Sequence, residues 1–386
     1  MIDLSRTDGV NGSVAAGFEG VADAMAALAA ESSDYSAQFC AYHRGVPVVD
    51  IWAGSDAGPD RIHGVFSVTK GMAGACIAIL VDRGLIDLDA PVGRYWPEFA
   101  QSGKAAITVR SALSHQAGVV GVDPQVSLAV TLDHDEMARL VARQMPFWRP
   151  GAGMGYHALT IGTIMDELIR RVTGATAAEF FRDQVAGPRA IDAYIAVPDV
   201  MESRVDPVLP VRTMDAQPAE VPQQPFVEPA SLTGVAFNAA RFDPFDPPLA
   251  NLRAARAAGH AAVGGAASAR GLARLYAAIT EDIDGRGPLV SSATVAEMSQ
   301  LQVAAVDLVL GLPARYAVVW QKADERLAYG SHRAFGHDGA GGAFGVADPE
   351  FRLAVGYVPS RLTEPGGADP RGLALAAAAR RAVIAG

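Results

Sequence analysis

The stretch Ser67-Val68-Thr69-Lys70 opens a segment of small and apolar residues that ends at Gly84. This pattern predicts a helix over 67–83, with the glycine as its stop signal. Positions three apart on a helix share one face, so the Ser67 hydroxyl and the Lys70 amine can come within hydrogen-bonding distance. Ser67 would lie in the first turn, where free backbone N–H groups stabilise negative charge.

The lysine of this stretch is one of only three in the chain, with Lys104 and Lys322. Arginine supplies nearly all the other positive charge. Because arginine cannot release its proton at neutral pH and a desolvated lysine can, Lys70 is a candidate base for a nucleophilic serine. The alternative is a helix start with a solvated lysine, and the spacing alone does not decide between the two.

Two further stretches follow in the chain. They are Trp148-Arg149-Pro150-Gly151 with Gly155-Tyr156-His157-Ala158, and Gly336-His337-Asp338-Gly339-Ala340-Gly341-Gly342. Together with Ser67-x-x-Lys70 they resemble the serine β-lactamase and penicillin-binding-protein superfamily, most closely its class C β-lactamase-like esterases, the family VIII carboxylesterases. Thr108-Val109-Arg110 and Leu113-Ser114-His115-Gln116-Ala117-Gly118 resemble a further stretch of that family. The resemblance is weakest between Val205 and Ala262.

The resemblance implies acyl transfer through a covalent intermediate. Ser67 would attack the ester carbonyl, and Lys70, with a pKa lowered by burial and neighbouring positive charge, would accept its proton directly or through Tyr156. Tyr156 would pass a proton to the leaving alcohol. Backbone N–H groups of Ser67 and Ala340 would form the oxyanion hole. The implied substrate-binding residues are His337, Asp338, Gly339, Trp148 and His157, and Trp148 is also interpreted as a packing residue near the cleft.

Three positions depart from the β-lactamase pattern. His337 and Asp338 stand at the Lys and Thr of Lys-Thr-Gly, and Ala158 stands at the Asn of Tyr-x-Asn. An anion at Asp338 would repel a substrate carboxylate. We therefore expect small neutral, short-chain carboxylic esters as substrates.

Other functions stay open on the same fold. They are a β-lactamase, a D-Ala-D-Ala peptidase-like amide hydrolase, an acyltransferase, or a catalytically silent binding protein. The chain has no Gly-x-Ser-x-Gly motif, which counts against an α/β-hydrolase esterase.

The order of strand-like and helix-like patterns predicts an α+β fold. Residues 1–81 and 262–386 would form one antiparallel sheet domain from both termini, and 82–261 an inserted, mostly helical domain. The resemblance implies a β-lactamase-like fold, with helices flanking the sheet and the active site between the domains. Residues 205–260 are rich in proline and alanine and predict a loop or lid over the pocket, with a plain linker as the alternative.

Periodicity also predicts individual elements. The helices are expected over 14–30, 135–144, 159–172, 268–280 and 373–384, and the strands over 37–42, 48–52, 315–321, 334–337, 342–347 and 351–358.

Composition narrows the partners. The chain has 386 residues and a net charge of −10, which argues against nucleic acid or an anionic membrane. Its longest apolar run is too short to span a bilayer, and the first residues do not read as a secretory signal, so the cytoplasm is expected. The predicted partner is a small-molecule ester, and the chain would be a monomer or small homo-oligomer.

Two features could indicate other chemistry. Cys40 and Cys76 lie in apolar surroundings and are predicted to be buried free thiols. The run Asp133-His134-Asp135-Glu136 could ligate a metal, but it precedes a predicted helix and is better interpreted as a cap. No metal and no cofactor are expected.

Overall fold

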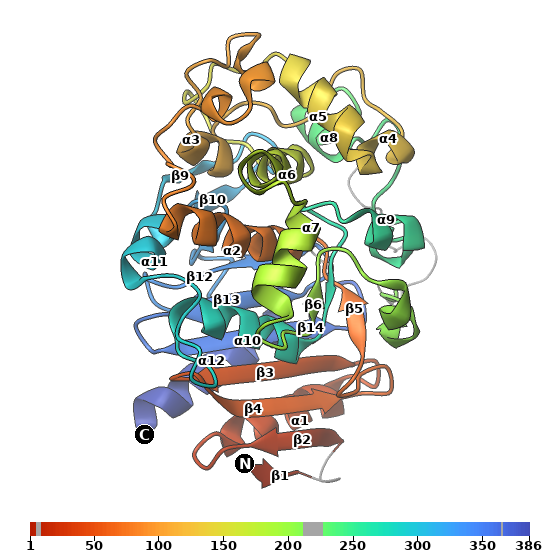
Figure 1. Cartoon of the computed structure of the whole chain (residues 1–386). Helices are drawn as coiled ribbons and strands as arrows, with labels where there is room; N and C mark the ends of the chain where they lie inside the picture. The colour runs from red at the N-terminus through yellow and green to blue at the C-terminus, as the bar shows by residue number, and fades with distance from the viewer. Residues whose placement is uncertain (5–8, 211–226, 364–365) are drawn as a thin grey trace.

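The computed structural model describes residues 1–4, 9–210, 227–363 and 366–386. In this part of the chain ten strands form one antiparallel sheet in the order β1-β2-β4-β3-β14-β13-β12-β11-β10-β9 (Figure 1). Their bounds are β1 (Ile2–Asp3), β2 (Val10–Val14), β3 (Ala37–His43), β4 (Val46–Ala53), β9 (Val303–Val306), β10 (Pro313–Tyr316), β11 (Gln321–Lys322), β12 (Phe335–Asp338), β13 (Phe344–Asp348) and β14 (Leu353–Pro359). Because β14 pairs with β3 along its whole length, the two ends of the chain build the sheet together, as predicted.

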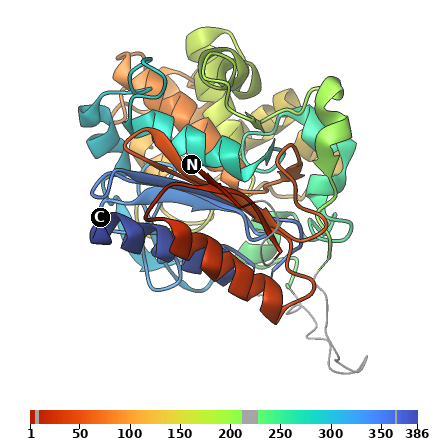
Figure 2. The same ribbon diagram turned by 90° about the horizontal axis from the view of Figure 1, so that it is seen from below.

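Helices cover both faces of the sheet (Figure 2). On one face α1 (Glu19–Glu31) and α12 (Pro370–Ala385) pack against each other and enclose an apolar core with the strands. On the other face lie α10 (Ala269–Thr280) and α2 (Val68–Asp82). This arrangement confirms the predicted α+β fold class, with helices flanking an antiparallel sheet, and it agrees with the fold that the resemblance implies.

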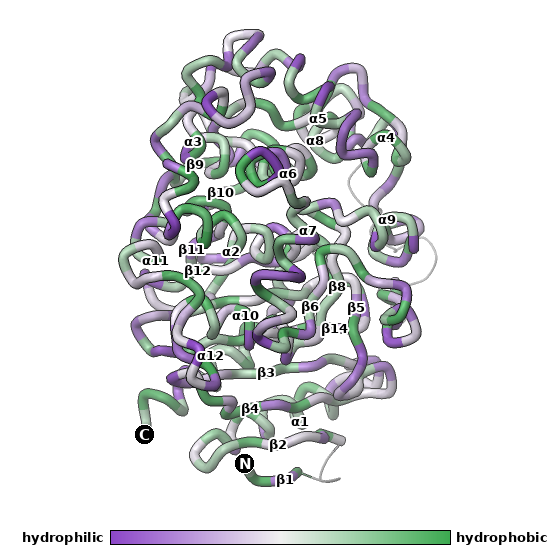
Figure 3. Tube along the Cα trace, viewed as in Figure 1, coloured by the Kyte–Doolittle hydropathy of each residue, from purple (hydrophilic) through white to green (hydrophobic). Residues whose placement is uncertain are grey.

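Helix α2 is buried from Val68 to Leu80, and hydrophobic colour covers most of it in Figure 3. It contacts β12 of the sheet and α6 (Thr160–Thr173) of the helical region. Small residues allow this close packing, since a Cβ at Gly74 would lie 3.0 Å from the Trp320 ring nitrogen. The core around α2 is therefore continuous between sheet and helices, and the predicted domain boundaries at 81/82 and 261/262 stay predictions.

The other helices lie above the sheet or beside it in Figure 1. They are α3 (Val109–Leu113), α4 (Leu128–Leu132), α5 (His134–Arg143), α6, α7 (Ala177–Phe180), α8 (Leu232–Phe237), α9 (Arg253–Ala258) and α11 (Ser292–Ser299), of which α11 contacts α2. Short 3-10 turns occur at Val92–Arg94, Pro97–Ala100, Asp199–Arg204 and Leu249–Asn251, and a π-helical turn at Phe181–Ala186. A second, small sheet runs in the order β6 (Ala193–Tyr194), β8 (Ala266–Ala267), β5 (Ile62–Gly64) and β7 (Val205–Asp206).

Most predicted elements are confirmed with small shifts at their ends, and two are corrected. The helix expected over 14–30 begins only at Glu19, because the chain before it forms β2. The strand expected over 315–321 is wrong, because the chain turns and Tyr316 pairs with Gln321 across a hairpin. The residues between them are apolar because they are buried, and Val319 has a φ of 66° that no strand residue adopts.

Other sequence predictions can be checked in the same part of the chain. Cys40 and Cys76 are buried free thiols, as predicted. None of the described helices combines the length and the apolarity that a membrane span requires.

The acidic run before α5 caps the helix, as predicted, since Asp133 Oδ1 accepts a hydrogen bond from the Glu136 N–H. The next residue has a role that the sequence analysis missed. His134 Nδ1 lies 2.7 Å from Asp166 Oδ2, and its Nε2 lies 2.8 Å from Glu167 Oε1, both on α6. Burial disfavours the imidazolium, but the two carboxylates outweigh it and raise the pKa of His134 to about 9.

We expect the free energy of unfolding to decrease in the alkaline pH range because of His134. A folded-state pKa above the ordinary 6.5 stabilises the fold fully below pH 6.5, and this stabilisation is lost as the pH rises through about 9. The gap in unfolding free energy between wild type and His134→Gln should be on the order of 3 kcal/mol at about pH 6 and should shrink by about pH 9.5. Thermal or denaturant unfolding measures it, with the exposed His332→Gln as control, and a gap that is constant with pH would contradict the assignment.

Candidate active site

The Ser67 and Lys70 side chains meet as the helical spacing predicts. Lys70 Nζ lies 3.0 Å from Ser67 Oγ, and it donates a second hydrogen bond of 3.1 Å to the Ala262 carbonyl. Lys70 is completely buried. Burial holds the pKa of the Lys70 amine well below its ordinary value, while the Asp338 carboxylate acts in the opposite direction. The neighbouring positive charge expected from the sequence is therefore not what lowers this pKa.

The turn before α2 fixes Ser67 at the start of the helix. Phe66 adopts a φ of 47°, a left-handed conformation that is strained for an aromatic residue. Thr69 Oγ1 donates a hydrogen bond to the Phe66 carbonyl and accepts one of 3.0 Å from the Gly265 N–H. The segment 262–265 thus anchors the turn and also supplies the carbonyl that binds Lys70.

Glycines allow the turn between β12 and β13 to pack against Val65 and Phe66. A Cβ at Gly339 would lie 2.2 Å from the Val65 carbonyl oxygen, and one at Gly341 would lie 2.9 Å from the Phe66 ring. Only residues without side chains fit there. Ala340, between them, lines one cavity with Ser67, while their joint role as oxyanion hole stays a prediction.

Tyr156 completes the predicted catalytic group. Its ring centroid lies 4.9 Å from Lys70 Nζ, and it lines the same cavity as Ser67. Burial raises the pKa of the Tyr156 hydroxyl above its ordinary value, and the neighbouring Ser67 side chain offsets this only in part. Tyr156 therefore holds its proton at neutral pH.

Asp307 positions Tyr156, and the sequence analysis missed it. Its Oδ1 accepts a hydrogen bond of 3.0 Å from the Tyr156 N–H, and further bonds from the backbone N–H groups of Val309 and Leu310. Asp307 is completely buried. The available signal was one acidic residue inside the apolar run from Val303 to Leu312.

His157 and Trp148 do not line the cavity that contains Ser67, and their role in substrate binding stays a prediction. His157 Nε2 accepts a hydrogen bond of 3.1 Å from the Val119 N–H, and its Nδ1 donates one of 2.7 Å to the Gly155 carbonyl. Trp148 Nε1 donates to the Gly153 carbonyl. Both side chains hold the loop of Tyr156 in place, which agrees with the interpretation of Trp148 as a packing residue.

His337 is also absent from the cavity lining. It is completely buried, and its Nδ1 donates a hydrogen bond of 2.7 Å to the Asp338 carbonyl. Its Cβ faces α2, since a Cβ added at Gly71 would lie 3.1 Å from it. Burial, helped by Lys70, lowers the pKa of His337 to about 4, so the ring is neutral.

Asp338 does line the cavity, but not as a bare anion. Its Oδ1 accepts a hydrogen bond of 2.7 Å from Gln321 Nε2, and its Oδ2 accepts bonds from Arg326 Nη1 and the Ala368 N–H at 3.0 and 2.9 Å. Burial opposes ionisation, but Arg326 and the other partners hold the pKa of Asp338 below its ordinary value. Gln321 and Arg326, which also line the cavity, were not found from the sequence.

The cavity has a volume of about 490 Å³ and two kinds of wall. One wall contains Ser67, Tyr156 and Ala340 together with the polar side chains of Gln321, Arg326 and Asp338. Apolar side chains form most of the rest: Val227, Phe237, Ala239, Phe242, Pro244, Phe245, Leu310 and Leu312. Thr233, Asp243, Gly366 and Gly367 complete the lining. Several come from the segment 205–260, of which 211–226 lies outside the described residues, and the role of this segment as a lid stays a prediction.

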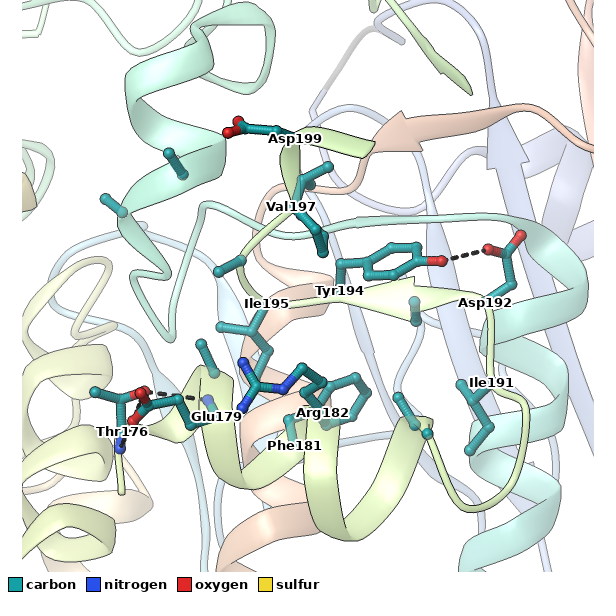
Figure 4. Close-up of a pocket in the computed structure, with 18 of the residues that line it drawn as sticks. Thr176, Glu179, Phe181, Arg182, Ile191, Asp192, Tyr194, Ile195, Val197 and Asp199 are labelled. Carbon is teal, nitrogen blue, oxygen red and sulfur yellow. Dashed lines mark hydrogen bonds between the residues drawn. The ribbon is translucent and has the colours of Figure 1, made fainter. Parts of the chain in front are cut away.

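Another hollow, of about 740 Å³, lies between α7, residues 181–199 and α9 (Figure 4). Several of its polar groups are paired with one another, as Figure 4 shows for the Tyr194 hydroxyl and Asp192 Oδ1, which are 3.2 Å apart. None of the predicted site residues lies there. Across the described residues, no three His, Cys, Asp or Glu side chains are grouped to hold a metal ion.

Comparison with known proteins agrees with this geometry. Residues 21–380 match the Beta-lactamase family. The chain is 32% identical over 349 residues to the esterase/beta-lactamase LipL of Mycobacterium tuberculosis, covering 84% of this chain and 76% of LipL. The structure of EstA from Arthrobacter nitroguajacolicus Rue61a superposes with a TM-score of 0.90 at 42% identity, over 96% of this chain and 98% of EstA.

The crystal structure of a family VIII carboxylesterase gives a TM-score of 0.87 at 34% identity, over 97% of this chain and 99% of the other. The family match over most of the chain, the shared fold and the extent of these similarities all agree. The chain therefore belongs to the Beta-lactamase family, as a hydrolase of the esterase/β-lactamase type that is closely similar to family VIII carboxylesterases.

Proposed function

We propose that the protein is a serine carboxylesterase that hydrolyses small neutral esters through an acyl-enzyme on Ser67. The observation that supports this most is the 3.0 Å contact between Ser67 Oγ and a buried lysine amine, at the wall of a mostly apolar cavity. A cavity of about 490 Å³ accommodates a small ester. His337 and Ala158 do not offer the groups with which β-lactamases hold an anionic lactam.

The first half of the reaction forms the acyl-enzyme. Burial favours the neutral form of the Lys70 amine, whose lone pair then accepts the Ser67 proton as Oγ attacks the carbonyl carbon. The carbonyl oxygen takes up the negative charge and is stabilised by the backbone N–H groups of Ser67 and Ala340. Tyr156, which holds its proton, donates it to the leaving alcohol oxygen and recovers a proton from Lys70.

The second half releases the acid. A water molecule takes the place of the alcohol and loses its proton to the Tyr156 and Lys70 pair as it attacks the acyl carbon. The tetrahedral intermediate collapses, Ser67 leaves as the alcohol, and the proton returns to its Oγ. Every proton stays within the three side chains and the substrate.

The proposal is tested with p-nitrophenyl esters from acetate to laurate, with nitrocefin alongside. We expect the shorter esters to be hydrolysed with much higher kcat/KM than nitrocefin, and Ser67→Ala to lose several orders of magnitude in kcat while its thermal unfolding stays unchanged. A folded Ser67→Ala that retains a tenth of the activity would exclude Ser67 as the nucleophile. Faster turnover of nitrocefin would favour a β-lactamase.

We expect Lys70→Arg to lose nearly as much activity as Lys70→Ala. Arginine keeps the positive charge but cannot become a neutral base. The kcat values of both variants on p-nitrophenyl acetate measure this. Lys104→Arg is the matched control, because Lys104 is another buried lysine that donates to carbonyls, of Ala142 and Gln144, and it does not line the cavity. Substantial activity in Lys70→Arg would place the base elsewhere.

Tyr156→Phe should lower kcat far more than it raises KM, because it removes only the hydroxyl that transfers the proton. The control is Tyr316→Phe, since the Tyr316 ring is stacked on Tyr156 at 6.3 Å and its hydroxyl has no hydrogen-bond partner among the described residues. That variant should keep kcat. An unchanged kcat with a raised KM in Tyr156→Phe would make Tyr156 a substrate contact only.

A further inference from the structure

The polar wall of the cavity contains one cation, Arg326, whose hydrogen-bonding capacity is only partly used. Its Nη1 donates to Asp338 Oδ2 at 3.0 Å, and among the described residues its side chain makes no other hydrogen bond. The side chain is 35% exposed and lines the cavity with Ser67. A guanidinium has five N–H donors, so Arg326 still has donors to offer a bound molecule.

The neighbours of Arg326 hold it rigidly. Asp338 is itself fixed by Gln321 and by the Ala368 N–H, and Gln321 accepts a hydrogen bond from the Tyr329 hydroxyl at 3.1 Å. A Cβ on Gly367 would lie 2.7 Å from Arg326 Nη1, so this glycine leaves room for the guanidinium. A donor that is already fixed loses little entropy when it binds an acceptor.

The charge of Arg326 is already balanced. Asp338 forms the ion pair, and the carboxylate of Asp243, which accepts a hydrogen bond from the Phe245 N–H, lines the cavity as well. An anionic ligand would meet this excess of negative charge and would also have to be desolvated. A neutral oxygen acceptor avoids both the electrostatic repulsion and the desolvation of an anion.

We propose that Arg326 determines substrate specificity by donating a hydrogen bond to a neutral oxygen acceptor that the ester carries away from its scissile bond. The substrate class is then an ester with a second carbonyl or ether oxygen and an apolar remainder, which the phenyl groups of Phe237, Phe242 and Phe245 enclose. Asp338 masks the charge of Arg326 and so selects against carboxylates. This inference rests on the proposed esterase function and names the substrates of the same site.

The test compares p-nitrophenyl esters of equal length, corrected for spontaneous hydrolysis. The acyl groups are alkyl, the methyl esters of succinate and adipate, and the free adipate anion. For wild type we expect at least one methyl ester to exceed its alkyl match in kcat/KM by about fivefold, the effect of one hydrogen bond. Arg326→Met should bring this ratio close to one, whereas the exposed Arg333→Met should leave it unchanged.

A second set of variants tests whether Asp338 masks the charge of Arg326. Asp338→Asn should raise kcat/KM for the adipate anion relative to the methyl ester by about fivefold or more, because Arg326 is then unpaired. The double variant Asp338→Asn/Arg326→Met, which also keeps the charge balance if Arg326→Met alone fails to fold, should lose both this gain and the acceptor preference. A double variant that keeps the gain would show direct repulsion by Asp338 and overturn the masking.

These outcomes are separable from failure of the esterase proposal. Hydrolysis that survives Ser67→Ala would refute the esterase mechanism itself. Hydrolysis that depends on Ser67, combined with equal acceptor preference in wild type, Arg326→Met and the double variant, would overturn only the role of Arg326.

Discussion

The Lys70 amine lies where water is excluded, and much of the surrounding structure covers it. A charged ammonium is costly in such a place, so the neutral amine is favoured, and the Ala262 carbonyl and Ser67 hydroxyl take up its hydrogen bonds. Exclusion of water requires α2 to be covered on all sides. The sheet provides one side and α6 another, which explains why the helix that begins after Ser67 is apolar almost throughout.

Buried polar side chains around the site act mainly on the backbone. Asp307 accepts N–H groups from the Tyr156 loop, His157 binds Val119 and Gly155, and Asp338 binds the Ala368 N–H. These hydrogen bonds offset the free-energy cost of burying the polar groups. Polar side chains around the cavity thus hold backbone segments in place, which the motifs alone do not reveal.

The sequence predicts best what depends on local geometry. The meeting of Ser67 and Lys70 follows from helical spacing. The side of β12 that faces the cavity could also have been predicted from the sequence. Side chains alternate along a strand, so only one of His337 and Asp338 can point there. The partners of Asp338 could not be predicted, because Arg326 and Ala368 are 12 and 30 residues away in the chain and contact Asp338 only through tertiary folding.

The same limit applies to secondary structure. The apolar run around Val319 reads as a strand, but packing against α2 turns it into a hairpin bend, and no local signal marks the change. Asp133 was assigned correctly as a cap because capping acts within one turn. The adjacent His134 binds α6, over thirty residues further along, so its ion pairs could not be read from the run that contains it.

The scarcity of lysine has a consequence for how this protein can be handled. All three lysines, Lys70, Lys104 and Lys322, are buried in the fold. Reagents that react with amines, such as succinimidyl esters and glutaraldehyde, therefore meet no accessible lysine on the folded chain. Coupling to a surface or a dye and crosslinking between copies can use carboxylates instead, since 42 acidic residues outnumber 32 lysines and arginines.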